Sequence, residues 1–149
     1  MTAPPNSKRE ELLALAARCE AATGPDRRLD AMIGAVVGVE PKERNVYRRG
    51  HFIGNNPVLL RIAQDYPKFT TSLDAALSLV PDGAHIGMGA DAIDPLRGWA
   101  WVRVRSAGTW EEFHSPERDG LAPLEPMPRN IATALTAACL RALAAMEDA

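Results

Sequence analysis

The residues best suited to hold a ligand lie close together in the stretch 44–56. This stretch combines cations, aromatic rings and side-chain amides, namely Arg44, Tyr47, Arg48, Arg49, His51, Phe52, Asn55 and Asn56. Guanidinium groups bind phosphate or carboxylate through paired hydrogen bonds, and aromatic rings stack on bases. The stretch therefore predicts a site for an anionic, nucleotide-like ligand. A solvated basic loop is the competing interpretation, because the stretch holds little cationic charge.

A second candidate site lies on the predicted strand 99–105. Its residues alternate in character, and successive side chains of a strand point to opposite faces. Trp99, Trp101 and Arg103 share one face and could form a stacking platform. The more ordinary role of two tryptophans on one face is a core layer beneath a helix. The predicted ligand-binding residues are thus Arg48, Arg49, His51, Asn55, Asn56, Trp99 and Trp101.

No residues with the spacing of a metal or catalytic site stand out. His51, His85 and His114 are scattered, and none has a His, Cys or carboxylate partner at metal-ligand spacing. His85 is expected as a hydrogen-bonded residue on a buried strand. Asp91 and Asp94 could transfer protons, but solvation is the more common fate of exposed carboxylates. We therefore expect no metal, no cofactor and no catalysis.

Two amphipathic helices are expected at the N-terminus. Ser7 begins a capping box at the start of the first helix, which is expected to run to about residue 22. Gly24 would close that helix in the left-handed conformation. The second helix is expected to begin at residue 25 or 26 and to end at Gly38.

The stretch 69–105 carries the clearest local pattern. Thr71 is the predicted N-cap of a central helix, whose apolar stripe consists of Leu73, Ala76, Leu77 and Val80. The turn 81–83 ends that helix, because proline cannot continue it and Asp-Gly favours a turn. Residues 84–89 and 99–105 then form an antiparallel hairpin, and 109–114 a third strand at the sheet edge.

The remaining segments are irregular, except for the last. Residues 58–63 form a short strand or a helical turn, with the pattern weakly favouring the strand, and the proline-rich segment 115–128 is expected to be a loop. A final helix is expected, with Asn130 or a residue just before Pro128 as its N-cap. Its alanine-rich composition would let it pack close to its neighbour. The apolar stripe of this helix is expected to contain Ile131, Leu135, Ala138, Cys139, Ala142 and Met146, and Leu140 and Leu143 would widen it.

Length and composition limit the class of protein. With 149 residues, 46% hydrophobic and 24% charged, the chain has the composition of one soluble domain, 1–149, with a disordered tail at 1–6. The formal net charge of -2 gives no strong nucleic-acid signal. Cys19 and Cys139 fall in helical patterns, so two buried thiols are expected rather than a disulfide. The sequence shows neither a membrane span nor a signal peptide, which favours a cytoplasmic protein.

Several segments of the sequence resemble the phage ABA sandwich domain of small phage and prophage proteins. The resemblance is carried by residues 9–13, 22–30, 71–81 and 99–102 and by the alanine-rich helix 132–145. It departs at 39–65 and 106–126, where such proteins vary in length and composition. The resemblance implies a phage origin and an α+β fold, a three-layer α/β/α sandwich with a small, mainly antiparallel sheet. It carries over no catalytic residues.

These features predict a phage-derived, non-catalytic binding protein that sequesters a small, anionic, nucleotide-like host defence signal. The prediction depends on the phage context and on the basic stretch around Arg48. The alternative is a phage assembly or adaptor protein that binds another protein and takes no small-molecule ligand. With either function we expect the cytoplasm of an infected bacterial host as the location, and self-association as a homo-oligomer.

Overall fold

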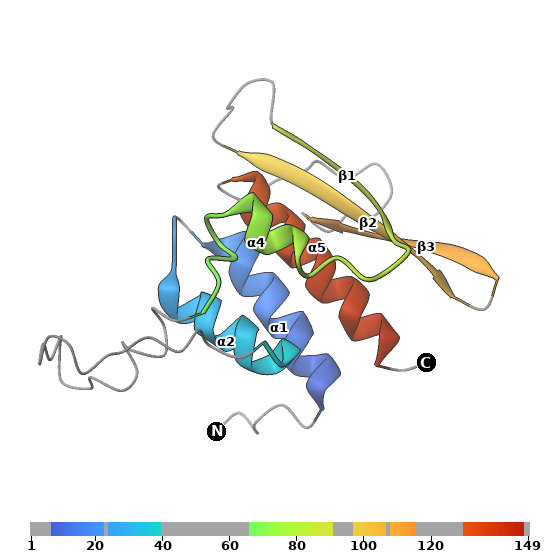
Figure 1. The fold of residues 1–149 in the computed structure, drawn as a ribbon, viewed down its shortest axis with the longest axis horizontal. Helices are drawn as coiled ribbons and strands as arrows, with labels where there is room; N and C mark the ends of the chain where they lie inside the picture. The colour runs from blue at the N-terminus through green and yellow to red at the C-terminus, as the bar shows by residue number, and fades with distance from the viewer. Residues whose placement is uncertain are drawn as a thin grey trace, which may run out of the picture.

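The computed structural model describes residues 7–22, 24–39, 66–90, 97–106, 108–115 and 130–147. Within these ranges the chain forms helices α1 (Lys8–Ala21), α2 (Arg27–Val37), α4 (Leu73–Leu77) and α5 (Ile131–Met146) and strands β1 (His85–Ala90), β2 (Gly98–Ser106) and β3 (Thr109–Ser115) (Figure 1). This is the predicted α+β class. None of these helices is long and apolar enough to cross a membrane. The expected tail at 1–6, the weak strand at 58–63 and the expected loop after residue 115 lie outside the described ranges.

The ends of the two N-terminal helices follow from local capping. The Ser7 side chain accepts the backbone N–H of Glu10 at 3.2 Å, as the capping box predicts. Asp26 caps α2 in the same way, and Gly38 ends it as expected, with a left-handed backbone at a φ of 81°. The prediction of a left-handed Gly24 is wrong, because α1 passes directly into extended backbone at its C-cap and needs no left-handed residue there.

The strands form an antiparallel sheet in the order β1-β2-β3. His85 pairs with Arg103 between β1 and β2, and Val102 pairs with Phe113 between β2 and β3. The predicted hairpin and third strand are therefore confirmed. Residues directly opposite each other on neighbouring strands share a face. The register thus assigns each described side chain of the sheet to one of two faces.

One face of the sheet is apolar and turns toward the helices; we call it the inner face. The β2 residues of this face are buried, and α5 packs directly on them. Small side chains on both partners let the helix and the sheet approach closely. The apolar residues of the inner face are Ile86, Met88, Ala100, Val102, Val104 and Phe113.

Helix α5 lies at the centre of the fold. Every residue from Ala132 to Leu140 is buried, and α5 contacts α1, α4 and all three strands. The prediction that this helix buries a single stripe is therefore wrong. Its small side chains let neighbours pack on several sides, whereas Met146 of the expected stripe is 48% exposed near the helix end. Of the two predicted N-cap positions, Asn130 is confirmed, because its side chain accepts the N–H of Thr133 at 2.7 Å.

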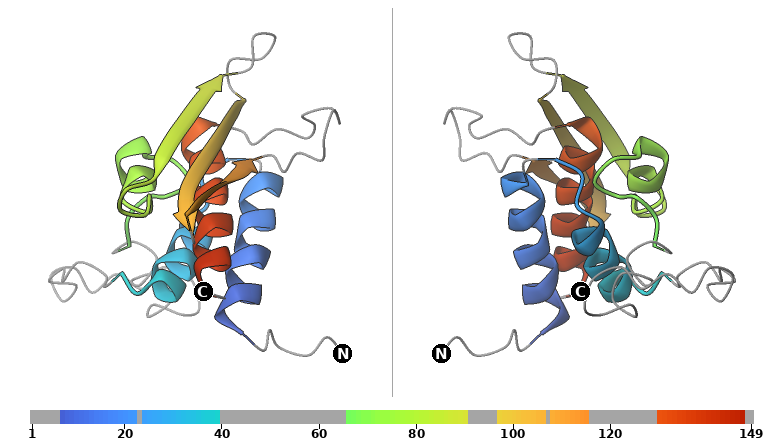
Figure 2. Two further views of the ribbon diagram at one scale, coloured as in Figure 1. Left: turned by 90° about the vertical axis from the view of Figure 1, so that its right-hand side faces the viewer. Right: turned by 90° about the vertical axis from the view of Figure 1, so that its left-hand side faces the viewer.

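The described helices all lie on one side of the sheet (Figure 2). Helix α1 runs beside α5, α2 packs against α1, and α4 flanks α5. The described residues thus form a sheet backed by helices on its inner face. The third layer of the expected α/β/α sandwich stays a prediction.

The short helix α4 begins one residue later than predicted, with Ser72 rather than Thr71 as its N-cap. The helix ends after 5 residues, so the residues that follow leave the helical path. The predicted stripe is therefore only partly formed. Leu73 and Leu77 are 39% and 38% exposed, and Leu79, beyond the end of the helix, is buried instead.

Candidate ligand-binding face

The face of the sheet that points away from the helices, here called the outer face, carries the large aromatic and charged side chains of the strands. All three tryptophans of the chain lie on it. Tryptophan is usually highly buried in folded proteins. The outer face is therefore the strongest candidate site among the described residues. It consists of His85, Gly87 and Gly89 of β1, Trp99, Trp101, Arg103 and Arg105 of β2, and Trp110, Glu112 and His114 of β3.

The indole rings of Trp99 and Trp101 lie over two glycines of the neighbouring strand. A Cβ atom built on Gly87 would be 2.3 Å from Cε2 of Trp101, and one built on Gly89 would be 2.6 Å from Cζ2 of Trp99. Only glycine leaves room for the rings there. Among the described helices none forms a core layer over these tryptophans, because α5 covers the opposite, small-residue face of β2. Both tryptophans are half-buried.

Charged side chains lie next to Trp101. The guanidinium carbon of Arg103 is 5.2 Å from a ring centroid of Trp101, within the range of a cation–π interaction. Arg103 also donates a hydrogen bond to Oε2 of Glu112 at 3.1 Å. The other carboxylate oxygen of Glu112 lies 3.7 Å from Nε2 of His114. Arg103 is thus already engaged by a ring and a carboxylate, while the exposed Arg105 extends the same row of β2.

His85 and Trp110 form a further aromatic contact on the outer face. Their ring centroids are 4.7 Å apart, and their planes are inclined by 29°. Both side chains are exposed, Trp110 by 45%. The prediction of His85 as a residue of a buried strand is wrong. Its strand lies at the sheet edge, and no helix of the described ranges covers its outer side.

The outer face offers aromatic planes for stacking and guanidinium groups for an anion. This combination suits a ligand that is both flat and negatively charged, such as a nucleotide. Within the described ranges, no three His, Cys, Asp or Glu side chains form a group that could hold a metal ion.

Of the predicted ligand-binding residues, Trp99 and Trp101 lie together on the outer face. Five others, Arg48, Arg49, His51, Asn55 and Asn56, lie outside the described residues, as do Asp91 and Asp94. Sequence reasoning did not place Arg105, Trp110 and Glu112 at this site. The register of β2 and β3 would have found them, because alternation in two paired strands brings these side chains to one face.

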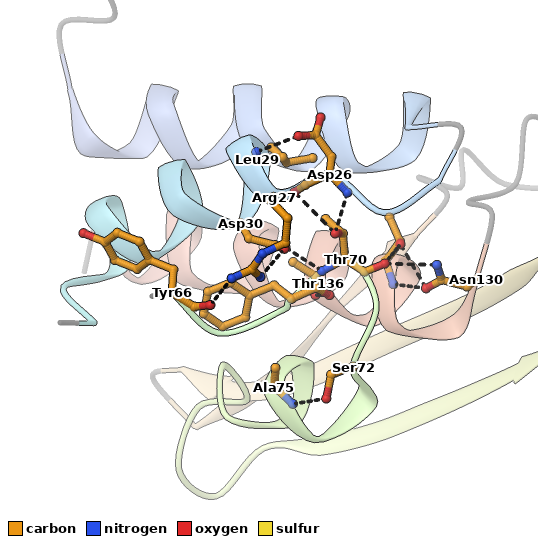
Figure 3. Close-up of polar contacts among 12 residues, drawn as sticks. Asp26, Arg27, Leu29, Asp30, Tyr66, Thr70, Ser72, Ala75, Asn130 and Thr136 are labelled. Carbon is orange, nitrogen blue, oxygen red and sulfur yellow. Dashed lines mark hydrogen bonds and ion pairs between the residues drawn. The ribbon is translucent and has the colours of Figure 1, made fainter. Parts of the chain in front are cut away.

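A buried polar cluster joins α2 to the segment that precedes α4 (Figure 3). Asp30, which has no exposed surface, accepts the backbone N–H of Thr70 and the guanidinium of Arg27, each at 2.8 Å. Arg27 also donates to the carbonyl of Tyr66 at 2.7 Å. The hydroxyl of Thr70 in turn accepts the N–H of Asp26 at 3.0 Å.

The same segment is fixed to α5 through its backbone carbonyls. The carbonyl of Thr70 accepts hydrogen bonds from the side chains of Asn130 at 3.0 Å and Thr133 at 3.1 Å. The carbonyl of Phe69 accepts one from Oγ1 of Thr136 at 2.9 Å. Because these donors and acceptors satisfy one another inside the protein, we assign the cluster a structural role.

Burial is the main cause of the pKa shifts in the interior. It raises the pKa of Asp30, against the hydrogen bonds from Thr70 and Arg27, which favour the charged carboxylate. Burial also raises the pKa of Cys19 and of Cys139 to about 12, so both thiols stay protonated at neutral pH. The two buried free thiols expected from the sequence are confirmed. Buried, protonated thiols are unreactive, and neither cysteine belongs to a candidate site.

Arg141 connects α5 to both α1 and β3. It donates to the carbonyl of His114 at 2.7 Å and pairs with Glu20 of α1. Burial lowers the pKa of Arg141, but a guanidinium paired with a carboxylate keeps its charge at any physiological pH. Arg141 thus fixes the backbone of β3 at His114. The imidazole of His114 points to the outer face, where it approaches the carboxylate of Glu112.

No family model, no curated protein and no solved structure matches the chain. The resemblance to the phage ABA sandwich domain therefore stays a prediction.

Proposed function

We propose that the outer face binds an anionic, nucleotide-like ligand and holds it without converting it. One observation carries the proposal. All three tryptophans and two arginines, Arg103 and Arg105, lie on the sheet face opposite the one that α5 covers. Aromatic rings and cations gathered on one face that no described helix covers are typical of an interaction site.

Stacking and ion pairing would both contribute to such binding. A base stacked on an aromatic side chain is stabilised by about 1–3 kcal/mol. A phosphate would accept charge-assisted hydrogen bonds from guanidinium groups. Trp101 and Arg103 lie close enough to serve one ligand together, since the guanidinium carbon is 5.2 Å from the ring centroid. Their proximity favours a ligand in which a flat ring and an anion are linked.

We infer retention rather than turnover from the state of the acidic group at the site. Among the described residues of the outer face, the only carboxylate is Glu112. This carboxylate already accepts a hydrogen bond from Arg103 at 3.1 Å and is therefore engaged within the face itself. Sequestration of a host signal in the cytoplasm of an infected bacterium is the biological role that fits, given the resemblance to phage proteins. We propose further ligand contacts from Arg48, Arg49, His51, Asn55 and Asn56.

Isothermal titration with AMP, cyclic nucleotides and ADP-ribose tests the proposal. We expect saturable binding to one of these classes, with the nucleotide recovered unchanged by chromatography after incubation. Trp101→Leu should weaken binding, whereas Glu111→Gln, on the same sheet but the inner face, should not. If the folded protein binds none of these nucleotides at millimolar concentration, the proposal fails. Conversion of the nucleotide to product would instead show an enzyme.

A second candidate function is favoured by the exposure of Trp110. Tryptophan and arginine are enriched in the cores of protein–protein interfaces, and Trp110 is 45% exposed. An adaptor that binds a protein, or a second copy of this chain, through the outer face would use the same residues. Light scattering after size-exclusion chromatography distinguishes these cases. A homo-oligomer that forms through this face should dissociate when Trp110 is replaced, as in Trp110→Ser. A protein adaptor should show no binding of nucleotides.

A further inference from the structure

The residues of β2 that share the outer face indicate how many nucleotides the ligand contains. We propose that the outer face takes two consecutive nucleotides of a single strand, one base on Trp99 and one on Trp101, with the flanking phosphate held by Arg103 and Arg105. This inference rests on the proposed function and gives its ligand a length and a direction. Residues 99, 101, 103 and 105 share one face of the strand, so the rings come first and the cations follow.

The two tryptophans provide separate seats for two bases. They are two residues apart on one strand, which places their side chains about 7 Å from each other along it. Each ring also has its own position on the neighbouring strand, because Trp99 lies over Gly89 and Trp101 over Gly87. The rings therefore form a row along the strand and do not stack on each other. One base cannot cover both.

The spacing of the two seats requires an extended strand. Stacked bases follow one another at about 3.4 Å, roughly half the distance between the two side chains. Bases lying on Trp99 and Trp101 must therefore be unstacked from each other, as in single strands bound to aromatic sheet surfaces. A base-paired duplex keeps its bases stacked and does not offer their flat faces. The geometry thus favours a single strand over a duplex.

The cations define the direction of the bound segment. Arg103 contacts the ring of Trp101 and extends the row beyond it, and Arg105 follows on the same face. A nucleotide whose base lies near Trp101 brings its phosphate to these guanidinium groups. The base either replaces Arg103 over the indole or stacks on the guanidinium plane, which is itself a stacking surface. Trp99 lies at the other end of the row and would serve the second base only.

Three nucleotide probes, titrated into the whole chain, distinguish one stacking position from two. They are AMP, the 5′-phosphorylated adenine dinucleotide pApA, and a single-stranded hexaadenylate, each titrated by calorimetry. Since one stacked base contributes about 1–3 kcal/mol, and 1.4 kcal/mol is tenfold in affinity, pApA should bind roughly 5- to 150-fold more tightly than AMP. Equal affinity for pApA and the hexamer indicates a small dinucleotide ligand. A tighter hexamer indicates a longer strand, and both results support two seats.

The variants make the assignment specific. Trp99→Leu should weaken the binding of pApA far more than the binding of AMP, while Trp101→Leu should weaken both alike. Trp99→Phe keeps an aromatic plane and should retain much of the advantage, which separates stacking from a general structural effect. Far-UV circular dichroism and melting temperature show whether each variant is folded.

The inference and the proposed function fail in different ways. If AMP and pApA bind equally, or if Trp99→Leu weakens both alike, the outer face has a single base seat and the inference is overturned while the proposed function stands. A duplex hairpin that binds as tightly as the hexamer also overturns it. If no nucleotide binds to the folded protein, the proposed function itself is wrong.

Discussion

Gly87 lies directly beneath the indole ring of Trp101, its cross-strand partner: a Cβ atom at position 87 would be 2.3 Å from Cε2 of that ring. Gly87→Ala therefore forces either the ring or the strand to move. We expect the free energy of unfolding to fall by about 1–3 kcal/mol, as for other overpacked sites. Affinity for a nucleotide should fall as well. Urea unfolding followed by circular dichroism, with titration of AMP, measures both.

Gly24→Ala is the matched control for that substitution. A Cβ atom at Gly24 would meet nothing within 4 Å, and the residue does not adopt a positive φ. This variant should unfold and bind like the original chain. Equal effects of the two substitutions would contradict the close contact between Gly87 and Trp101.

Glu112 should restrain anion binding, because its carboxylate pairs with Arg103 on the outer face. Glu112→Gln removes that competition and the repulsion of a phosphate. We expect an increase in nucleotide affinity of about 1.5- to 5-fold, the range for an exposed ion pair. The control is Glu111→Gln, which makes the same charge change on the opposite face of β3. A similar gain in both variants would reflect net charge alone, and the gain should shrink in high salt.

Asp30→Ala should be strongly destabilising. It leaves the backbone N–H of Thr70 and the guanidinium of Arg27 without their buried acceptor. Loss of such a partner costs about 2–4 kcal/mol. Asp82→Ala, at an exposed turn, should change the unfolding free energy by less than about 0.5 kcal/mol. If the two variants unfold at the same urea concentration, the cluster does not hold the fold together.

The raised pKa of Asp30 gives a pH dependence of stability with a definite sign. Burial lifts the folded pKa above the ordinary value of 3.8. Between these two values the folded state keeps a proton that the unfolded state releases, so the contribution of Asp30 to stability falls as pH rises through this window. The difference in unfolding free energy between the original chain and Asp30→Asn should therefore decline from pH 3.8 upward and then level off. A difference that grows with pH would mean that the Arg27 ion pair outweighs burial.

Neither cysteine should react in the native protein. Burial raises both thiol pKa values to about 12, and both side chains lie in the core. Ellman's reagent at pH 8 should label neither thiol in buffer and both in urea, because only unfolding exposes them and restores an ordinary thiol pKa. Rapid labelling of Cys19 or Cys139 in buffer would show that α1 and α5 separate readily.

Local signals predicted the parts of the fold that depend on local contacts. The Ser7 cap, the end of α2 at Gly38 and the alternation of β2 each depend on residues within a few positions, and each is confirmed. Alternation defines two faces but does not say which one is covered. The outcome depends on side-chain size: an alanine-rich helix packs closely on the small side chains of β2, and the tryptophans would hold it away.

The candidate site and its support depend on contacts between distant segments. Thr70 reaches Asp30 across 40 positions of sequence, and no local pattern predicts that pairing. The positions of the Trp99 and Trp101 rings depend on glycines of the neighbouring strand. In the sequence, those glycines appear only as interruptions of an apolar segment. The strand register determines which glycine lies under which tryptophan, and no pattern in the sequence gives that register.

The central position of α5 has a consequence for the order in which the protein is made. α1 leaves the ribosome early, yet its principal neighbour is a helix that begins only at Ile131. At about 5–20 residues per second, the nascent chain spends on the order of 5 to 20 seconds between the end of α1 and the start of α5. During that time α5 is not yet available to cover the apolar faces of α1 and of the sheet. Until the central helix emerges, the nascent chain therefore exposes apolar surface that favours aggregation.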